Sequence, residues 1–153
     1  MRSFKHTSIA GLLVAAMFLA CEAFADNCTG TFTNVGHSAE KQDLGNGVTL
    51  TSFSALSGNT WNNKDEARIG TCAGYVLTTA NGKYRVVYAW ARKNKAGDIS
   101  VDEGSLEPDA ERGTWKVTTA TGALAKSIGD SGWWKAVLDD GKVTSGVWGG
   151  NCK

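Results

Sequence analysis

Between residues 26 and 153, hydrophobic and polar positions alternate over short runs of β-branched and aromatic residues, and these runs are separated by turn dipeptides. Long stretches with the 3.6-residue period of an amphipathic helix are missing. The clearest unit runs from Ala67 to Lys93, where two alternating runs meet at Asn81-Gly82. Asn-Gly is the preferred pair for a two-residue hairpin turn, because both positions must tolerate a positive φ. The pattern therefore predicts a β-hairpin here.

The same reading predicts eight strands, near residues 29–35, 47–56, 67–79, 83–93, 98–106, 113–119, 132–138 and 142–150. Turn residues at Asn46-Gly47, 96–98 and 139–141 favour simple hairpin connections. Strands linked in this way can close into a barrel, which removes exposed sheet edges. We predict an all-β fold, with a single eight-stranded antiparallel up-and-down β-barrel over residues 26–153. A β-sandwich is the alternative, although it usually needs longer crossing connections.

Two segments do not fit the strand pattern. The segment from Gly58 to Glu66 is polar apart from Trp61, which predicts a long loop at one mouth of the barrel. The segment from Thr121 to Ser131 is predicted to hold a helical turn.

The first 25 residues have the three regions of a cleavable signal peptide. Arg2 and Lys5 form a basic start, residues 9–20 are apolar but too short to span a bilayer, and Ala23-Phe24-Ala25 is a small-x-small cleavage triplet. We therefore expect a periplasmic or secreted protein that begins near Asp26 and is not held at the membrane after cleavage.

Charge excludes one class of partner. Without residues 1–25, the chain has 14 basic and 14 acidic residues and is formally neutral. Nucleic-acid binders concentrate basic residues on one surface, since binding to phosphates depends on released counterions. The short run at residues 92–95 is followed by Ala96-Gly97-Asp98, which indicates a solvated hairpin tip. We expect no nucleic-acid partner.

Three cysteines, Cys28, Cys72 and Cys152, remain after cleavage, and an oxidising compartment favours pairing. The pair Cys28–Cys152 is favoured because it would tie the two ends of the chain together, although sequence alone leaves the other pairings open. Cys72 is then expected to be a buried thiol that acts as a small apolar core residue.

The sequence also argues against cofactors. His37 is the only histidine after residue 25, which excludes zinc sites built from several histidines. Haem-attachment, dinucleotide and phosphate-loop motifs are missing. We expect neither a cofactor nor a bound metal.

Aromatic residues are the main positive signal. Tyr84, Val86, Tyr88 and Trp90 share one face of a predicted strand and are expected to point into the barrel. The candidate ligand-binding residues are Tyr75, Tyr84, Trp90, Trp115 and Trp148. An eight-stranded barrel can be filled by such side chains or can hold one small ligand, and the sequence leaves both readings open. Trp133 and Trp134 are adjacent, so one of them must face outward, where it could mark a contact between copies of the chain.

Glu103 and Tyr88 are the candidate catalytic residues. Glu103 alternates with Ile99 and Val101, so it faces inward if those two do. Desolvation inside the barrel would then raise its pKa toward a value useful for acid/base chemistry.

The C-terminal half resembles the allene oxide cyclase-like barrels, a group related to dirigent proteins. The resemblance rests on Gly113-Thr114-Trp115-Lys116-Val117, on Thr121-Gly122 and on the segment from Gly129 to Trp133, within residues 67–150. It implies an eight-stranded barrel around an oxygenated or apolar ligand, in a group that includes cyclases and isomerase-like enzymes. Residues 123–128 depart from the glycine-rich segment that is typical at this point, and no catalytic residue carries over.

The leading hypothesis is an exported barrel that binds a small apolar or aromatic molecule, with a cofactor-independent isomerase, cyclase or lyase reaction left open. The first alternative is a ligand-binding protein without catalysis, used as lipocalins are. The second is a secreted interaction or inhibitor protein whose barrel is plugged and whose loop around Trp61 meets a partner.

Overall fold

The computed structural model describes residues 26–153 apart from Asn63 and the side chain of His37. The predicted signal peptide, residues 1–25, lies outside the described residues. The strands are β1 (Cys28–Gly45), β2 (Val48–Trp61), β3 (Ala67–Thr78), β4 (Tyr84–Lys93), β5 (Ile99–Leu106), β6 (Gly113–Ala120), β7 (Ser131–Asp139) and β8 (Val143–Asn151). A short 3₁₀ helix, η1 (Gly122–Ser127), connects β6 to β7.

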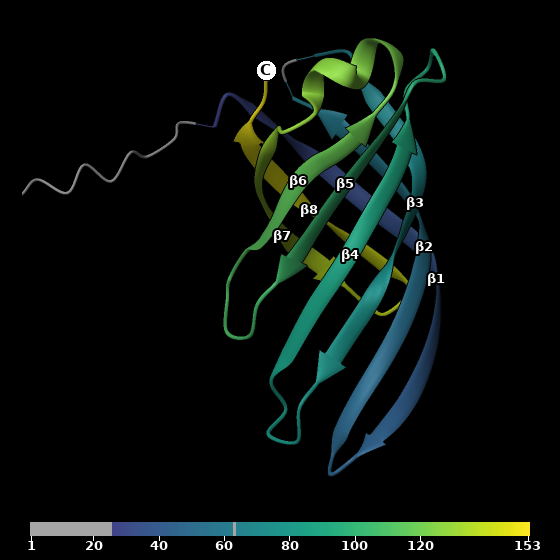
Figure 1. Ribbon diagram of the computed structural model, residues 1–153, viewed down its shortest axis with the longest axis vertical. Helices are drawn as coiled ribbons and strands as arrows, with labels where there is room; N and C mark the ends of the chain where they lie inside the picture. The colour runs from purple at the N-terminus through teal and green to yellow at the C-terminus, as the bar shows by residue number, and fades with distance from the viewer. Residues whose placement is uncertain (1–25, 63) are drawn as a thin grey trace, which may run out of the picture.

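The eight strands form one closed barrel in chain order, and each strand is antiparallel to its neighbours (Figure 1). β8 closes the barrel by pairing with β1 from Cys28↔Gly150 to Val35↔Val143. The predicted fold class is therefore confirmed, as is the helical turn between β6 and β7. No helix in the described part of the chain is long and apolar enough to cross a membrane.

The first two strands are longer than the sequence pattern predicts. Beyond Val35, β1 has no partner in β8 and pairs only with β2, from Ser38↔Ser54 to Gly45↔Val48. This end of β1 is an edge of the sheet, while β2 still pairs with β3 on its other side, and it extends below the barrel wall in Figure 1. Residues 38–45 of β1 are exposed and mostly polar, because this edge segment extends past the core. At its other end β2 continues to Trp61, so the predicted loop from Gly58 to Glu66 is wrong in its first half.

One of the two Asn-Gly turns matches the prediction and the other differs from it. Asn46 and Gly47 both have a positive φ and form a two-residue connection between β1 and β2. At Asn81-Gly82 only the glycine has a positive φ, and the connection runs from Thr79 to Lys83, whose backbone groups are hydrogen-bonded. The predicted hairpin is present, but its loop has five residues because the strands stop pairing at Thr78↔Tyr84.

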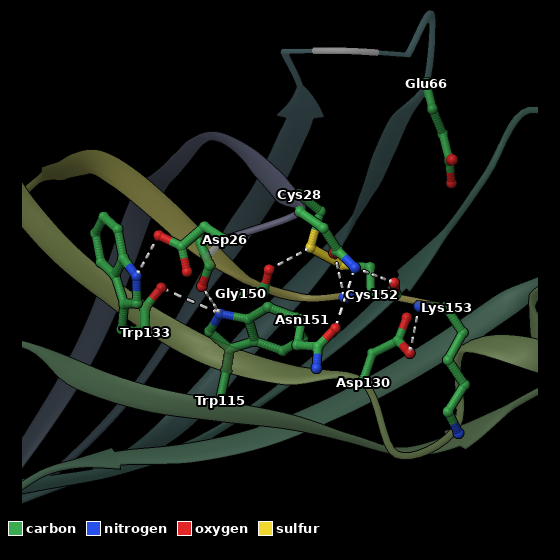
Figure 2. Close-up of a disulfide and its surroundings, with 12 residues drawn as sticks. Asp26, Cys28, Glu66, Trp115, Asp130, Trp133, Gly150, Asn151, Cys152 and Lys153 are labelled. Atoms are coloured by element: carbon green, nitrogen blue, oxygen red, sulfur yellow. Dashed lines mark hydrogen bonds between the residues drawn. A yellow bond between two sulfur atoms is a disulfide. The ribbon is translucent and has the colours of Figure 1, made fainter. Parts of the chain in front are cut away.

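The two ends of the described chain lie side by side (Figure 2). The disulfide Cys28–Cys152, which the sequence favoured, joins the start of β1 to the residue after β8. Asn27 adds hydrogen bonds from its side-chain amide to Asn151 and to the backbone carbonyl of Cys152. Cys72 is free and buried, as expected.

We call the end of the barrel that carries the disulfide and η1 the capped end. The opposite end, where the β1–β2, β3–β4, β5–β6 and β7–β8 connections lie, is the hairpin end (Figure 1). At the capped end, Asp98 accepts a hydrogen bond from the backbone N–H of Ala123 in the first turn of η1. This bond holds η1 against the β4–β5 connection.

Candidate functional site

The middle of the barrel is filled by four rings, which we call the aromatic layer: Phe32, Tyr88, Trp90 and Trp134. Ring centroids lie 4.5 Å apart for Tyr88 and Trp90, and 5.6 Å apart both for Phe32 and Trp90 and for Tyr88 and Trp134. The Tyr88 hydroxyl donates a hydrogen bond of 2.6 Å to the backbone carbonyl of Thr114. The layer divides the barrel interior into two parts.

Glycine makes room for this layer at two positions. A side chain at Gly104 would collide with the ring of Tyr88, and one at Gly113 would collide with the indole of Trp134. Because both glycines lie on strands beside the layer, the large rings can reach the barrel axis and fill its cross-section.

A mostly apolar cavity of about 290 Å³ opens at the hairpin end. Tyr88 and Trp134 of the aromatic layer form its floor. Its walls include Phe53, Val76, Tyr84, Val86, Leu106 and Ala136. We call it the hairpin-end cavity, and its volume is just below the roughly 300–1,000 Å³ typical of sites for drug-sized ligands.

The titratable groups near its floor stay protonated at neutral pH. Burial raises the pKa of the Cys72 thiol to about 12, an effect that the charge of Arg92 partly opposes. Burial also raises the pKa of Tyr88 well above its ordinary value, and the charge of Asp102 adds to this. Neither group can therefore act as a base in the cavity near pH 7.

A second cavity, of about 270 Å³, lies at the capped end on the other side of the aromatic layer. Its walls include the indoles of Trp61, Trp115 and Trp148, and Trp148 contacts each of the other two edge to face. Five cationic and three acidic side chains also line it, a surplus of two positive charges. Figure 2 shows Trp115 beside the disulfide, with Glu66 and Asp130 at the edge of this capped-end cavity.

Two arginines inside the capped end stack on tryptophans. The Arg68 guanidinium lies 4.3 Å from the ring centroid of Trp61 and donates hydrogen bonds to Glu66 and Ser100. The Arg92 guanidinium lies 4.7 Å from the ring centroid of Trp90. Stacking of this kind fixes the plane of each guanidinium group.

Arg92 forms a buried ion pair with Asp102, in which the side chains are 5% and 4% exposed. Burial raises the pKa of Asp102, and the adjacent Arg92 opposes that shift. Burial also raises the pKa of Asp130, although the backbone N–H of Lys153 donates to its carboxylate and lowers it in part. The capped end therefore holds a buried ion pair and a buried carboxylate, whereas the carboxylate in the hairpin-end lining, Asp139, is exposed.

The structure distributes the predicted ligand-binding residues over three places. Trp90 lines both cavities, Tyr84 lies at the hairpin end, and Trp115 and Trp148 lie at the capped end. Tyr75 lies on the outer face of β3 and is 38% exposed, because the alternate residues Cys72, Gly74 and Val76 are the ones that face inward. Tyr75, a candidate ligand-binding residue, therefore lies outside both cavities.

The expectation that Glu103 faces inward is wrong. Ser100 and Asp102 are the inward residues of β5, while Ile99 is 46% exposed and Glu103 is on the outer surface near the Thr118 hydroxyl. The apolar residues Ile99 and Val101 had suggested that their face of β5 points inward. The interior is polar at this point, because Ser100 and Asp102 are hydrogen-bonded to arginines. Glu103 and Tyr88 thus lie on opposite faces of the sheet.

Trp134 and Trp133 face opposite ways, as their adjacency requires. Trp134 belongs to the aromatic layer, whereas the ring of Trp133 is covered on the outside by Arg112 at 4.1 Å. The indole N–H of Trp133 donates to Asp26 (Figure 2).

Sequence reasoning missed Arg68 and Asp102, and its placement of residues 92–95 at a solvated hairpin tip is wrong for Arg92, which is a buried residue of β4. One signal was available, since Arg92 continues the alternation of Tyr88 and Trp90 on β4 and so must face inward. Among the described residues there is no group of three or more histidine, cysteine or acidic side chains that could hold a metal ion. Comparisons with protein-family models, curated proteins and solved structures returned no match.

Proposed function

We propose that this protein is an exported β-barrel that binds a small apolar or aromatic molecule in the hairpin-end cavity. The observation that carries the proposal is the cavity itself: about 290 Å³ of space with mostly apolar walls above an aromatic floor. When an apolar ring enters, water is released from this lining, and the binding free energy becomes more favourable by roughly 25 cal/mol for each Å² of apolar surface buried. Kinship with the allene oxide cyclase-like barrels is part of the same proposal.

The chemistry around the cavity supports binding rather than rearrangement of the ligand. Tyr88 already donates its proton to the Thr114 carbonyl, and Cys72 is held as a neutral thiol. Glu103, the carboxylate considered for acid/base chemistry, lies on the other face of the sheet. Asp139, whose carboxylate does line the cavity, is exposed at the rim.

The disulfide supports the export part of the proposal. Cys28–Cys152 closes a loop with a sequence separation of 124, and disulfides of this kind persist in the periplasm or outside the cell. The aromatic layer and the disulfide together give a rigid barrel that carries its ligand without a cofactor.

A titration with 1-aminoanthracene, an apolar aromatic probe whose fluorescence rises in dry surroundings, tests the site. Val86 and Val87 offer a matched pair of positions, since Val86 lines the cavity and Val87 follows it on the outer face of β4. Val86→Trp fills the cavity and should weaken probe binding by about tenfold or more. Val87→Trp adds the same ring outside and should leave the affinity unchanged.

Equal affinities for the two variants would remove the hairpin-end cavity from the binding site. Saturable binding with 1:1 stoichiometry, in the low-micromolar to sub-millimolar range expected for a ligand of this size, supports the proposal. A folded protein that binds no apolar probe would instead favour the interaction protein with a plugged barrel.

A further inference from the structure

The capped-end cavity has flat apolar walls that the proposed function does not use. The ring centroids of Trp61 and Trp148 lie 4.9 Å apart, and those of Trp148 and Trp115 lie 5.9 Å apart. The indole N–H groups of Trp115 and Trp148 are bonded to backbone carbonyls, so the rings are held in place. These indoles offer a preformed surface for another ring.

Arg92, in the same cavity, is only partly satisfied. Both carboxylate oxygens of Asp102 accept from one amino group, Nη2, at 2.7 Å. The Nε–H group is buried and has no acceptor among the described residues. A buried donor without a partner is unfavourable, and charged donors favour anionic oxygens.

Asn59 is a second unsatisfied group in the wall. Its side-chain oxygen is buried and receives no hydrogen bond from the described residues. Both residues line the cavity, where Arg92 lacks an acceptor and Asn59 lacks a donor; the two atoms have no accessible surface, so a ligand meets them after a small rotation of these side chains. In the lining, Arg68 is paired with Glu66 and Arg92 with Asp102. The other charged side chains of the lining are three lysines, Lys64, Lys126 and Lys153, and one carboxylate, Asp130, so the positive charge is in excess.

We propose that the capped-end cavity is a second binding site, for a small aromatic carboxylate that carries a hydroxyl group. The carboxylate supplies the acceptor that Arg92 lacks, the hydroxyl supplies the donor that Asn59 lacks, and the ring packs on the indoles. The surplus of two positive charges favours an anion over a neutral sugar. An inorganic anion such as phosphate would leave the indole walls without a partner.

The probe for this site is 4-hydroxybenzoate, and the readout is the set of indole N–H signals in a ¹⁵N–¹H spectrum. The six tryptophans report on different places. Binding at the capped end should shift the signals of Trp61 and Trp148 in a saturable way. It should leave Trp133, on the outer face, unmoved.

Two analogues separate the contributions. Methyl 4-hydroxybenzoate keeps the ring and hydroxyl but loses the charge, and its affinity should be about tenfold lower or worse. Benzoate keeps the charge but loses the hydroxyl, and it should bind several-fold more weakly than the probe. An ester that binds as tightly as the acid would overturn the proposal.

Two variants keep the fold while altering the site. Arg92→Lys retains a positive charge for Asp102 but removes the Nε–H group, and it should weaken 4-hydroxybenzoate binding several-fold. Lys126→Glu reverses a charge at the exposed edge of the cavity and should weaken it also, whereas Lys135→Glu on the outer face of β7 should not. Unshifted Trp61 and Trp148 signals at millimolar probe, or equal losses in both charge-reversal variants, would overturn the proposal. Because 1-aminoanthracene and Trp134 report on the other end, the two sites can fail separately.

Discussion

Replacing Asp102 by Asn should destabilise the barrel far more than replacing its neighbour Glu103 by Gln. The two substitutions make the same chemical change at adjacent positions of β5, but Asp102 faces the interior and Glu103 faces solvent. In the Asp102→Asn variant the charge of Arg92 remains buried without its counter-charge, and its side chain is only 5% exposed.

The magnitude follows from that burial. Removing one member of a buried ion pair costs about 3–5 kcal/mol, and Asn still offers one oxygen to Nη2, so a loss of about 3 kcal/mol is expected. Glu103→Gln removes a charge that contacts only the Thr118 hydroxyl on the surface, and should change the unfolding free energy by less than about 0.5 kcal/mol.

Urea unfolding followed by tryptophan fluorescence measures both. With a slope of about 1–3 kcal/mol per molar urea, the Asp102→Asn midpoint should fall by about 1–3 M while that of Glu103→Gln stays in place. Arg85, whose pair with Glu107 is half exposed, provides a further reference: Arg85→Met should cost about 1 kcal/mol or less. Similar midpoints for the two β5 variants would refute the inward placement of Asp102.

The two cysteine environments give further predictions. Because the folded pKa of Cys72 is about 12 against an ordinary value of 9.0, the native state holds the proton while the unfolded state releases it, so stability falls as pH rises between these values. The fall due to this group is at most about 1.4 kcal/mol per pH unit and should vanish in Cys72→Ala; parallel pH curves for the two proteins would contradict the assignment. The native thiol should also resist iodoacetamide at pH 8 and react only after unfolding. Reduction of Cys28–Cys152, with its sequence separation of 124, should lower the unfolding free energy by up to about 5 kcal/mol, whereas an unchanged urea midpoint in reductant would mean that the bridge adds nothing to stability.

The strands and their order could be predicted because alternation and turn residues are local signals. A period of two marks each strand, and short connections leave little choice beyond an up-and-down arrangement. The excess length of β1 was invisible, because residues 38–45 are polar on both faces and pair only with β2. Pairing between strands, not amphipathicity, makes that segment extended.

The inward phase of a strand is harder to predict than its existence. On β4 the phase was clear, because Tyr88 and Trp90 are large rings on one side and Ala89 and Ala91 are small on the other. On β5 the usual rule that apolar residues face inward gave the wrong answer. Asp102 is tolerated inside only because Arg92, from the neighbouring strand, neutralises it, and that pairing depends on register.

A crystal structure of the protein with 1-aminoanthracene would show whether the hairpin-end cavity is the binding site. We expect the ligand in the hairpin-end cavity, with its rings above Tyr88 and Trp134 and its sides against Val76 and Val86. A probe bound on the outer surface, or a hairpin-end cavity that holds only water at saturating probe, would contradict the claim that this barrel binds small apolar molecules in its interior.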